Sequence, residues 1–383
     1  MQLHLSWALR WFADAGADIT LVTTAGGALP PESGARSVEM PGTRHGRYSR
    51  TWWRSTRRFV RDHPLSAWDA IVSEDSGAWG VVEELRRDPN RPPIAMFRHG
   101  TTLATIRSSI PPRNARAVGI AMLSFRDYLR HPRRLARSVD LMIAVSEKIA
   151  SSARLEGAGS QTEIRVVRLG VDLTRFSPSA DMADDRRALG LDPALPTFTW
   201  VGRDTPSKRS HLALRVVDRL SARGVPCQIA LAVARPRPAT LALADAVNRR
   251  HGPRVHLFPD ADQSRVRLVH RASSCFLFPS CWAEGLPITI MEALACGAPV
   301  LAWDGPTFRD LDVFRVQQDW IVRSSRLDDW VDRALASLQS EGMADRRASA
   351  RAIAERYYDI DATARSTVAA IKELIERWAR RDR

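Results

Sequence analysis

The stretch Phe276–Trp303, FLFPSCWAEGLPITIMEALACGAPVLAW, decides the fold of this chain. Its first apolar run predicts a buried strand over 274–278, followed by a turn. A helix is expected over 287–295, because proline suits the first helical turn and Gly297 lies just past the last one. A second apolar strand over 299–302 completes the unit. Strand, helix and strand in this order are typical of a parallel α/β sheet.

Two carboxylates bracket the turn of this unit. The turn lies at the carboxyl end of a strand, where open α/β sheets bind ligands, and the N–H groups at the helix start suit a phosphate. Glu284 precedes the helix, where the helix dipole favours an acid in any protein. Glu292 lies inside the helix among uncharged neighbours. It is therefore either a glutamate that faces solvent or a buried acid that accepts hydrogen bonds from sugar hydroxyls.

The pair Glu284-x7-Glu292, followed by Gly297-Ala298-Pro299-Val300, resembles the retaining nucleotide-sugar glycosyltransferases of the GT-B class, family 4. The resemblance implies that Glu292 binds the ribose of the donor nucleotide. It also implies that Glu284 is catalytic and contacts the donor sugar. The backbone at the helix start would bind the donor diphosphate, which gives donor-binding roles to Gly285, Leu286, Pro287 and Ile288.

Three further segments carry the same resemblance. Val145-Ser146-Glu147 resembles the family segment that follows a strand of the first domain. Gly170-Val171-Asp172 resembles the linker into the second domain. His99, at the end of an expected strand over 93–98, resembles the histidine that faces the acceptor and the transferred sugar. The resemblance implies a catalytic His99, whereas a histidine at a strand end can equally be structural.

The segment Gly202-Arg203-x4-Lys208 follows an expected strand over 197–201 and resembles the family's GR-x4-K segment. The resemblance implies that Gly202, Arg203 and Lys208 bind the donor diphosphate. A nucleoside diphosphate gains negative charge as the glycosidic bond breaks, and preorganised cations stabilise that charge. Lys208 is one of only three lysines among 57 basic residues, and lysine does not replace the planar fork of arginine. The alternative is an ordinary exposed basic pair.

The length of 383 residues and the hydrophobic content of 44% suit a globular chain of two domains. Alternating helices and apolar strands predict doubly wound parallel sheets. The resemblance implies the GT-B arrangement, in which two Rossmann-like domains face each other across a cleft. We expect an acceptor-binding domain over 1–178 and a nucleotide-sugar-binding domain over 179–358. A last helix over 359–383 would pack back on the first domain.

The beginning of the chain differs from the family pattern, which has a buried strand and a glycine-rich loop ahead of the first helix. Here the segment 3–15 already reads as that helix, and the next strand is expected over 18–23. We therefore expect an N-terminal domain that lacks its first strand. We also expect translation to start upstream of Met1, the alternative being a damaged or rebuilt relative.

The chain carries a net charge of +14, and its basic excess is greatest between Arg98 and Arg137. A basic amphipathic segment suits an anionic membrane surface, a basic patch can also bind nucleic acid, and an arginine-rich face can simply be solvated. No sequence motif of a nucleic-acid module is present, so we expect no nucleic-acid partner. We expect a cytoplasmic protein that lies peripherally on the inner face of the membrane.

The sequence contains no P-loop, no G-x-G-x-x-G, no zinc-ligand spacing and no G-x-S-x-G. We expect no cofactor and no metal, because a clamp of arginine and lysine can do the work of a metal ion at a diphosphate. The resemblance implies transfer with retention to a hydroxyl of a glycan, a lipid-linked or a small-molecule acceptor. Two alternatives are a catalytically silent GT-B subunit that binds a partner, and a nucleotide-sugar epimerase on the same fold.

Overall fold

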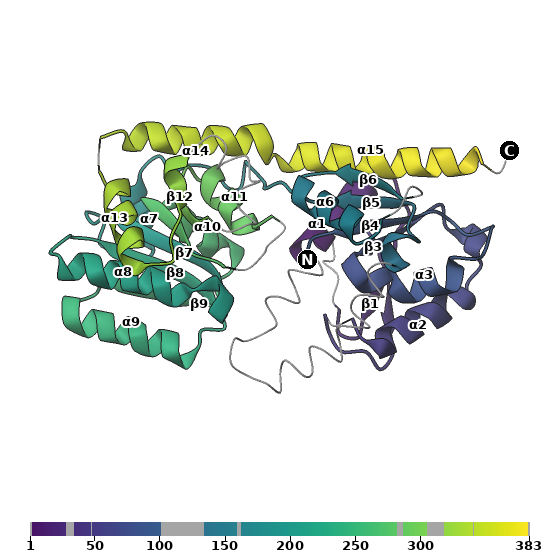
Figure 1. Ribbon diagram of the computed structural model, residues 1–383, viewed down its shortest axis with the longest axis horizontal. Coiled ribbons are helices and arrows are strands. Elements are labelled where there is room, and N and C mark those ends of the chain that lie inside the picture. Colours follow the sequence, from purple (N-terminus) through teal and green to yellow (C-terminus); the bar gives the residue numbers. More distant parts are fainter. Residues whose placement is uncertain are drawn as a thin grey trace. The chain divides into compact units, whose positions relative to one another are not determined.

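The computed structural model describes residues 2–27, 34–46, 48–100, 134–158, 162–281, 286–304, 318–339 and 341–381. The chain divides into two compact units, which Figure 1 shows. The first comprises Met1–Arg168 and Ala362–Arg383, and the second comprises Leu169–Asp361. We expected the boundary at residue 178, whereas the division falls ten residues earlier and assigns the linker at Gly170 to the second unit.

The second unit is built on one six-stranded sheet in which every strand pair is parallel. Its strands are β7 (Thr197–Arg203), β8 (Gln228–Ala234), β9 (Val255–Pro259), β10 (Cys275–Phe278), β11 (Val300–Trp303) and β12 (Ile321–Val322). The spatial order is β12-β11-β10-β7-β8-β9, so the sequence order reverses between β7 and β10. In open parallel sheets this reversal is the topological switch point, where ligands bind beyond the carboxyl ends of the strands.

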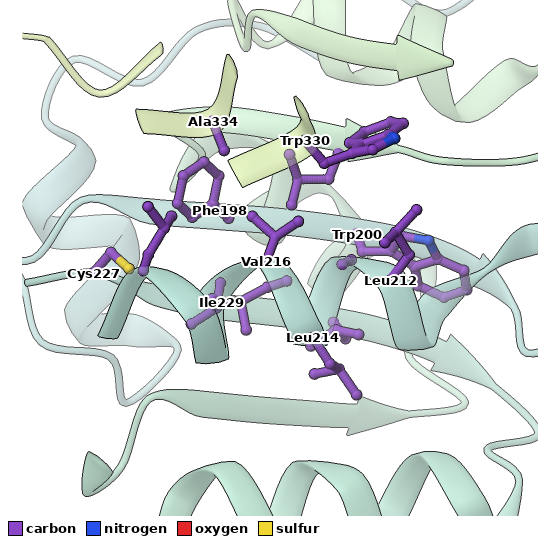
Figure 2. Packing of buried hydrophobic residues seen from close by; sticks show 14 of the residues in the cluster. Phe198, Trp200, Leu212, Leu214, Val216, Cys227, Ile229, Trp330 and Ala334 are labelled. Carbon is purple, nitrogen blue, oxygen red and sulfur yellow. The ribbon is translucent and has the colours of Figure 1, made fainter. Parts of the chain in front are cut away.

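Helices cover both faces of this sheet. They are α7 (Met182–Ala188), α8 (Ser210–Ala222), α9 (Pro238–His251), α10 (Gln263–Arg271), α11 (Ile288–Ala295), α13 (Leu327–Ser337) and α14 (Met343–Tyr357), with the 3₁₀ turns η4 (Pro206–Lys208) and η5 (Gln318–Trp320). Phe198 and Trp200 of β7 pack with α8 and α13 on one face, as Figure 2 shows. The intervening Thr199 points to the other face, where its hydroxyl shares a 2.7 Å hydrogen bond with Ser273 after α10. The alternation of side chains along β7 therefore determines which helices it contacts.

The first unit contains two separate parallel sheets. Its strands are β1 (Thr20–Thr24), β2 (Arg36–Met40), β3 (Ile71–Glu74), β4 (Ile94–Arg98), β5 (Leu141–Ala144) and β6 (Glu163–Val166). Its helices are α1 (Gln2–Asp14), α2 (Arg50–Arg61), α3 (Trp79–Leu85), α6 (Glu147–Leu155) and α15 (Ile360–Ala379), with the 3₁₀ turns η2 (Leu65–Ala67) and η3 (Asp75–Ala78). One sheet pairs β1 with β2, and the other has the order β3-β4-β5-β6.

Side-chain alternation also divides the core of the first unit. Ile94 and Met96 of β4 point to one face, where they pack with Trp79 and Val82 of α3. Phe97 points to the other face and packs with residues of α15, which is drawn in yellow across the β3–β6 sheet in Figure 1. The last helix is thus part of the first unit's core, although it lies about 200 residues away in the sequence.

The described residues contribute no strand that pairs with both β1 and β3, at the place where we expected the first strand of the family pattern to be missing. Among the described residues, neither strand has a partner on its edge toward the other. A cavity of about 200 Å³ lies between them and is lined by residues of both, including Val22 and Val72. Val72 is 37% exposed, whereas every residue of β4 and β5 is buried. The second unit has β7 at the corresponding place in its strand order, which is why its sheet is continuous.

The chain crosses between the two units twice, after Arg168 and after Asp361. Backbone hydrogen bonds join the two crossing segments within the second unit. The Val171 N–H donates to the carbonyl of Tyr358 at 2.8 Å, and the Ile360 N–H donates back to Val171 at 3.3 Å. Gly170 allows this approach, because a Cβ at its position would lie 2.4 Å from the Cα of Ile360. Any larger residue at position 170 would therefore push the segment around Val171 away from the segment around Ile360.

Among the described residues, no helix combines the length and apolar character that a membrane crossing requires. The basic segment 98–137, for which we expected an anionic membrane surface, lies largely outside the described residues. The membrane surface therefore stays a prediction.

We predict that hydrogen exchange will reveal the two open strand edges. In β1 and β3, the amides that do not bond to a neighbouring strand should exchange at least ~100-fold faster than those of β4 and β5, because local opening is easiest where the backbone lacks a partner. Mass spectrometry after timed deuterium labelling measures this difference. The matched control is β7, which is paired on both edges and should be protected throughout. Equal protection of β3 and β4 would contradict the open edges.

Candidate active site

Six of the expected donor-binding residues lie at or after the carboxyl ends of two neighbouring strands at the switch point of the second unit: Gly202, Arg203, Lys208, Leu286, Pro287 and Ile288. Arg203 is the last residue of β7, and Lys208 ends the 3₁₀ turn that follows. Leu286 and Pro287 precede α11, which begins at Ile288 after the neighbouring strand β10. The structure therefore brings to one sheet edge two segments that lie some 80 residues apart in the sequence.

The two cations differ in their surroundings. Arg203 is exposed and makes no ion pair with any residue that the structure describes. The Lys208 ammonium lies 5.5 Å from the ring centre of Phe278, the last residue of β10, which is a cation–π distance. Because β7 extends through Gly202 to Arg203, this arginine belongs to the strand and not to the loop that we expected. The strand end holds its backbone in a fixed place.

A buried aspartate that sequence reasoning missed organises the loop between these cations. Asp204 is 5% exposed and follows Arg203 directly. Its carboxylate accepts hydrogen bonds from the Ser210 hydroxyl at 2.7 Å and from the Arg237 backbone N–H at 2.7 Å. Burial alone would raise the pKa of Asp204, but the hydrogen bonds from Arg237, Ser210 and Thr240 outweigh it and lower the pKa. The ionised carboxylate thus fixes the loop to the starts of α8 and α9.

Backbone contacts join the loop after β7 to the loop after β10. The Cys281 N–H donates to the Ser207 carbonyl at 2.8 Å, and the Cys281 thiol donates to the same oxygen at 3.2 Å. The helix that follows has Pro287 as its N-cap residue, and the proline side chain provides no capping hydrogen bond. The first backbone N–H groups of α11 are therefore suited to an anion that approaches the helix end.

Glu292 is 3% exposed, so the alternative in which it faces solvent is wrong. It lies in the middle of α11, and its Oε2 is 3.6 Å from Nε2 of His270, a side chain that is fully buried. That separation is longer than a hydrogen bond, and neither ring nitrogen of His270 has a hydrogen-bond partner among the described residues. A buried carboxylate beside an unsatisfied imidazole is a polar pair that a ligand hydroxyl could satisfy.

Two of the expected site residues, Glu284 and Gly285, lie outside the described residues. The catalytic role of Glu284 and the diphosphate contact of Gly285 therefore stay predictions. The ribose contact of Glu292 and the diphosphate contacts of Arg203 and Lys208 stay predictions as well, although these three side chains have the placement described above.

His99 belongs to the first unit, where it lies in a cluster with His4 and Glu74. One carboxylate oxygen of Glu74 is 2.8 Å from Nδ1 of His4, and the other is 2.5 Å from Nε2 of His99. The side chains of His4 and Glu74 are buried, whereas that of His99 is 17% exposed. The ring centres of the two histidines are 4.6 Å apart. His99 is thus the member of the cluster that reaches the surface.

The ionisation of Glu74 follows from its two neighbours. Burial alone would raise the pKa of its carboxyl, but the hydrogen bonds from His4 and His99 and their charges outweigh burial and lower the pKa to about 2. Burial lowers the pKa of His4, against the hydrogen bond and charge of Glu74. The sequence offers a weak signal for Glu74, since an acid follows the expected strand directly, but nothing local indicates its partner His4, 70 residues away.

The residues after β3 hold this cluster in place. Asp75 adopts a left-handed backbone conformation with φ 43°, which is uncommon for a residue other than glycine, and its side chain accepts a hydrogen bond from the His99 backbone N–H at 3.1 Å. Gly77 permits close packing of Tyr48, because a Cβ at Gly77 would lie 3.0 Å from the tyrosine ring. Burial, and then the charges of Glu74 and Asp75, raise the pKa of Tyr48, so its hydroxyl stays protonated.

Two groups of described side chains carry atoms that could bind a metal ion. His4, Glu74 and His99 offer ligand atoms that lie within 4.8 Å of one another, but each Glu74 oxygen already bonds to a histidine. Asp260 and Asp262 follow β9 with Asp-x-Asp spacing, and both carboxylates already accept backbone N–H groups. The hydrogen bonds thus supply a structural role for both groups, and metal independence stays a prediction.

We predict that Glu74 contributes to the acid limit of stability. Its pKa is lowered in the folded state, so its contribution to the free energy of unfolding is present above the ordinary value of about 4.5 and is lost as pH falls toward 2. Glu74→Gln should therefore flatten the loss of stability between about pH 5 and about pH 3, which urea unfolding measures. Asp14→Asn, at an exposed position, is the control and should keep the wild-type slope. An unchanged slope in Glu74→Gln would contradict the assignment.

Two protein-family models match the chain side by side. The model described as Glycosyltransferase Family 4 matches residues 4–175, and the model described as Glycosyl transferases group 1 matches residues 181–355. Together they cover most of both units. The unit with His99 and the unit with the switch-point residues thus each match a glycosyltransferase family model.

Curated relatives agree with this assignment. A D-inositol 3-phosphate glycosyltransferase from Rhodococcus erythropolis is 31% identical over 272 residues, which are 68% of this chain and 57% of that protein. The lipopolysaccharide core biosynthesis mannosyltransferase LpsB of Rhizobium meliloti is 27% identical over 249 residues, which are 63% of this chain and 68% of that protein. The chain thus spans little more than half the length of the first of these relatives.

Solved structures share the fold at low sequence identity. Sucrose-phosphate synthase from Thermosynechococcus elongatus has a TM-score of 0.78 at 16% identity and covers 98% of this chain and 93% of its own. The Anabaena protein HepE, in complex with UDP, has a TM-score of 0.74 at 15% identity and covers 97% and 96%. The family models and the curated relatives show that the chain belongs to the group 1 glycosyltransferases, and the solved structures show that it has the GT-B fold.

Proposed function

We propose that this chain transfers a sugar from a nucleotide-sugar donor to an acceptor hydroxyl. The observation that carries the proposal is the meeting of Arg203, Lys208, the uncapped start of α11 and buried Glu292 at one switch point. These groups provide two cations and free N–H groups for a diphosphate, and a carboxylate for sugar hydroxyls. The Anabaena structures with the same fold contain UDP, or UDP-glucose, which supports a donor of this class.

In the proposed reaction the bond between C1 of the donor sugar and the β-phosphate oxygen breaks. A bond forms between C1 and the acceptor oxygen on the same face of the sugar, which retains the configuration. The acceptor's proton passes to the leaving phosphate oxygen, so no separate side-chain base is required. Arg203 and Lys208 stabilise the charge that develops on that oxygen, and Glu284 contacts the sugar. Their positive charge also makes a metal ion unnecessary for this step.

We place the acceptor at the first unit, next to His99. The exposed part of this ring can hydrogen-bond to a hydroxyl of the acceptor or of the transferred sugar. The net charge of +14 favours an anionic acceptor through long-range attraction. A phosphorylated cyclitol therefore belongs in the acceptor panel, as does a lipid-linked glycan, since the relatives named above act on an inositol phosphate and in lipopolysaccharide core synthesis.

A thermal-shift panel followed by a transfer assay tests the proposal. One nucleotide sugar should raise Tm, and its sugar should then appear covalently on one acceptor, with an anomeric configuration that NMR reads. Chelation of divalent metal ions should leave the rate unchanged. A product that forms from the donor alone would indicate an epimerase, and the absence of binding by any nucleotide or nucleotide sugar would indicate a silent subunit.

We predict that the two cations act on the leaving diphosphate. Arg203→Ala and Lys208→Ala should each lower kcat/KM at least about tenfold, which corresponds to ~1.4 kcal/mol of transition-state stabilisation. The controls are Arg249→Ala and Lys372→Ala, which remove exposed charges of the same type away from the switch point and should keep wild-type rates. Wild-type kinetics in both test variants would refute the clamp.

We also predict that Glu292 binds the nucleotide part of the donor. Glu292→Gln keeps the size of the side chain but replaces one acceptor oxygen by a donor, so it should weaken binding of the nucleoside diphosphate about tenfold in calorimetry. Glu284→Ala should leave this affinity unchanged and lower the rate of sugar transfer. If Glu292→Gln and Glu284→Ala had equal effects on nucleoside diphosphate affinity and on the rate of sugar transfer, the two carboxylates would not have distinct roles.

A further inference from the structure

The cluster of His4, Glu74 and His99 has a feature that sugar binding alone does not require. Both oxygens of one buried carboxylate are engaged, each by a histidine from a different element. His4 comes from α1, Glu74 ends β3, and His99 follows β4. The hydrogen bonds span 70 and 25 residues of sequence, so the fold itself assembles the arrangement.

The chemistry of the carboxylate determines which ring nitrogens carry protons. An ionised carboxylate only accepts hydrogen bonds, so each nitrogen that bonds to Glu74 must donate an N–H. His99 therefore carries its proton on Nε2, which is 2.5 Å from the carboxylate. In the neutral ring the second nitrogen, Nδ1, is then an acceptor. The same rule places a proton on Nδ1 of His4.

Glu74 and its neighbour Asp75 hold His99 at two points. The ring bonds to Glu74, and the backbone N–H of His99 bonds to the side chain of Asp75. Glu74 is in turn held by His4, whose ring is packed edge-on against Trp11 and Phe97 at centroid distances of 5.8 and 4.6 Å. These contacts restrict the rotation of the His99 side chain before any substrate binds. Preorganised sites use the same arrangement.

We propose that Glu74 is a positioning residue for His99 that fixes the ring in the Nε2–H tautomer and so makes Nδ1 the acceptor for a sugar hydroxyl. His4 supports this role from the buried side by holding the second carboxylate oxygen. The proposal deepens the function proposed above, because it rests on His99 as the residue that meets the reacting hydroxyls. It assigns the reacting atom of His99 and the source of its orientation.

Nitrogen NMR of the apo protein tests the tautomer without any assay of activity. In ¹⁵N-histidine-labelled wild-type protein, the His99 signal, identified by its loss in His99→Gln, should show protonated Nε2 and unprotonated Nδ1 in the neutral ring. In Glu74→Gln the side-chain amide can donate as well as accept, so the His99 signal should shift toward a mixture of tautomers. The internal control is His251, whose Nε2 lies 3.0 Å from Asp218 in the second unit and which should be unchanged.

Kinetics supply the second readout. Glu74→Gln should lower kcat about 10–100-fold, because a misplaced group of this kind costs that much, while affinity for the nucleoside diphosphate stays within about twofold of wild type. Asp218→Asn removes the matched carboxylate from His251 and should keep the wild-type rate. A wild-type His99 whose neutral ring is protonated on Nδ1 overturns the proposal, and so does a Glu74→Gln protein with unchanged His99 signals and unchanged kcat.

The two readouts separate this inference from the proposed function. The expected tautomer together with a wild-type rate in His99→Gln would refute His99 as an active-site residue, and with it the positioning role. An inactive His99→Gln protein with the Nδ1–H tautomer in wild type would leave sugar transfer in place and refute the role of Glu74. If Glu74→Gln does not fold, the wild-type spectrum still decides the tautomer.

Discussion

Every strand pair that the structure describes is parallel, and the rest of the molecule depends on that constraint. Parallel neighbours cannot be joined by a hairpin, so each connection crosses the sheet, usually through a helix, and both faces become covered. All strands of one sheet then end at the same edge. The predicted donor-binding residues at the ends of β7 and β10, and the pair of Glu74 and His99 at the ends of β3 and β4, lie at such edges for this reason.

Three buried acids lie at or near these strand ends. Asp204, Glu74 and Glu292 are each at most 6% exposed, yet they are satisfied in different ways. Backbone and side-chain donors fix Asp204, and two histidines fix Glu74. Among the described residues, Glu292 lies beside His270 at a separation beyond hydrogen-bond distance. The first two carboxylates therefore have hydrogen-bond partners within the chain, whereas Glu292 is the one for which we predict a ligand contact.

The elements of the switch point could be predicted from the sequence because their signals are local. The apolar run of β10, the proline before α11 and Gly297 after it, which adopts φ 72°, mark one strand and one helix. The separate strands of the first unit followed from the same kind of pattern, whereas the GT-B fold was implied by the family resemblance and is confirmed. Glu74 could not be assigned in this way, because its function depends on His4 and His99, and their proximity arises only when α1, β3 and β4 pack together.

The edges of β1 and β3 that have no partner among the described residues affect how this chain behaves in concentrated solution. Unpaired backbone groups beside apolar side chains form a template on which a strand from another molecule can add. The net charge of +14 opposes such encounters by mutual repulsion, but this repulsion is screened over about 8 Å at physiological ionic strength. The colloidal stability of the chain is therefore electrostatic, and added salt should promote self-association through these edges of the first unit.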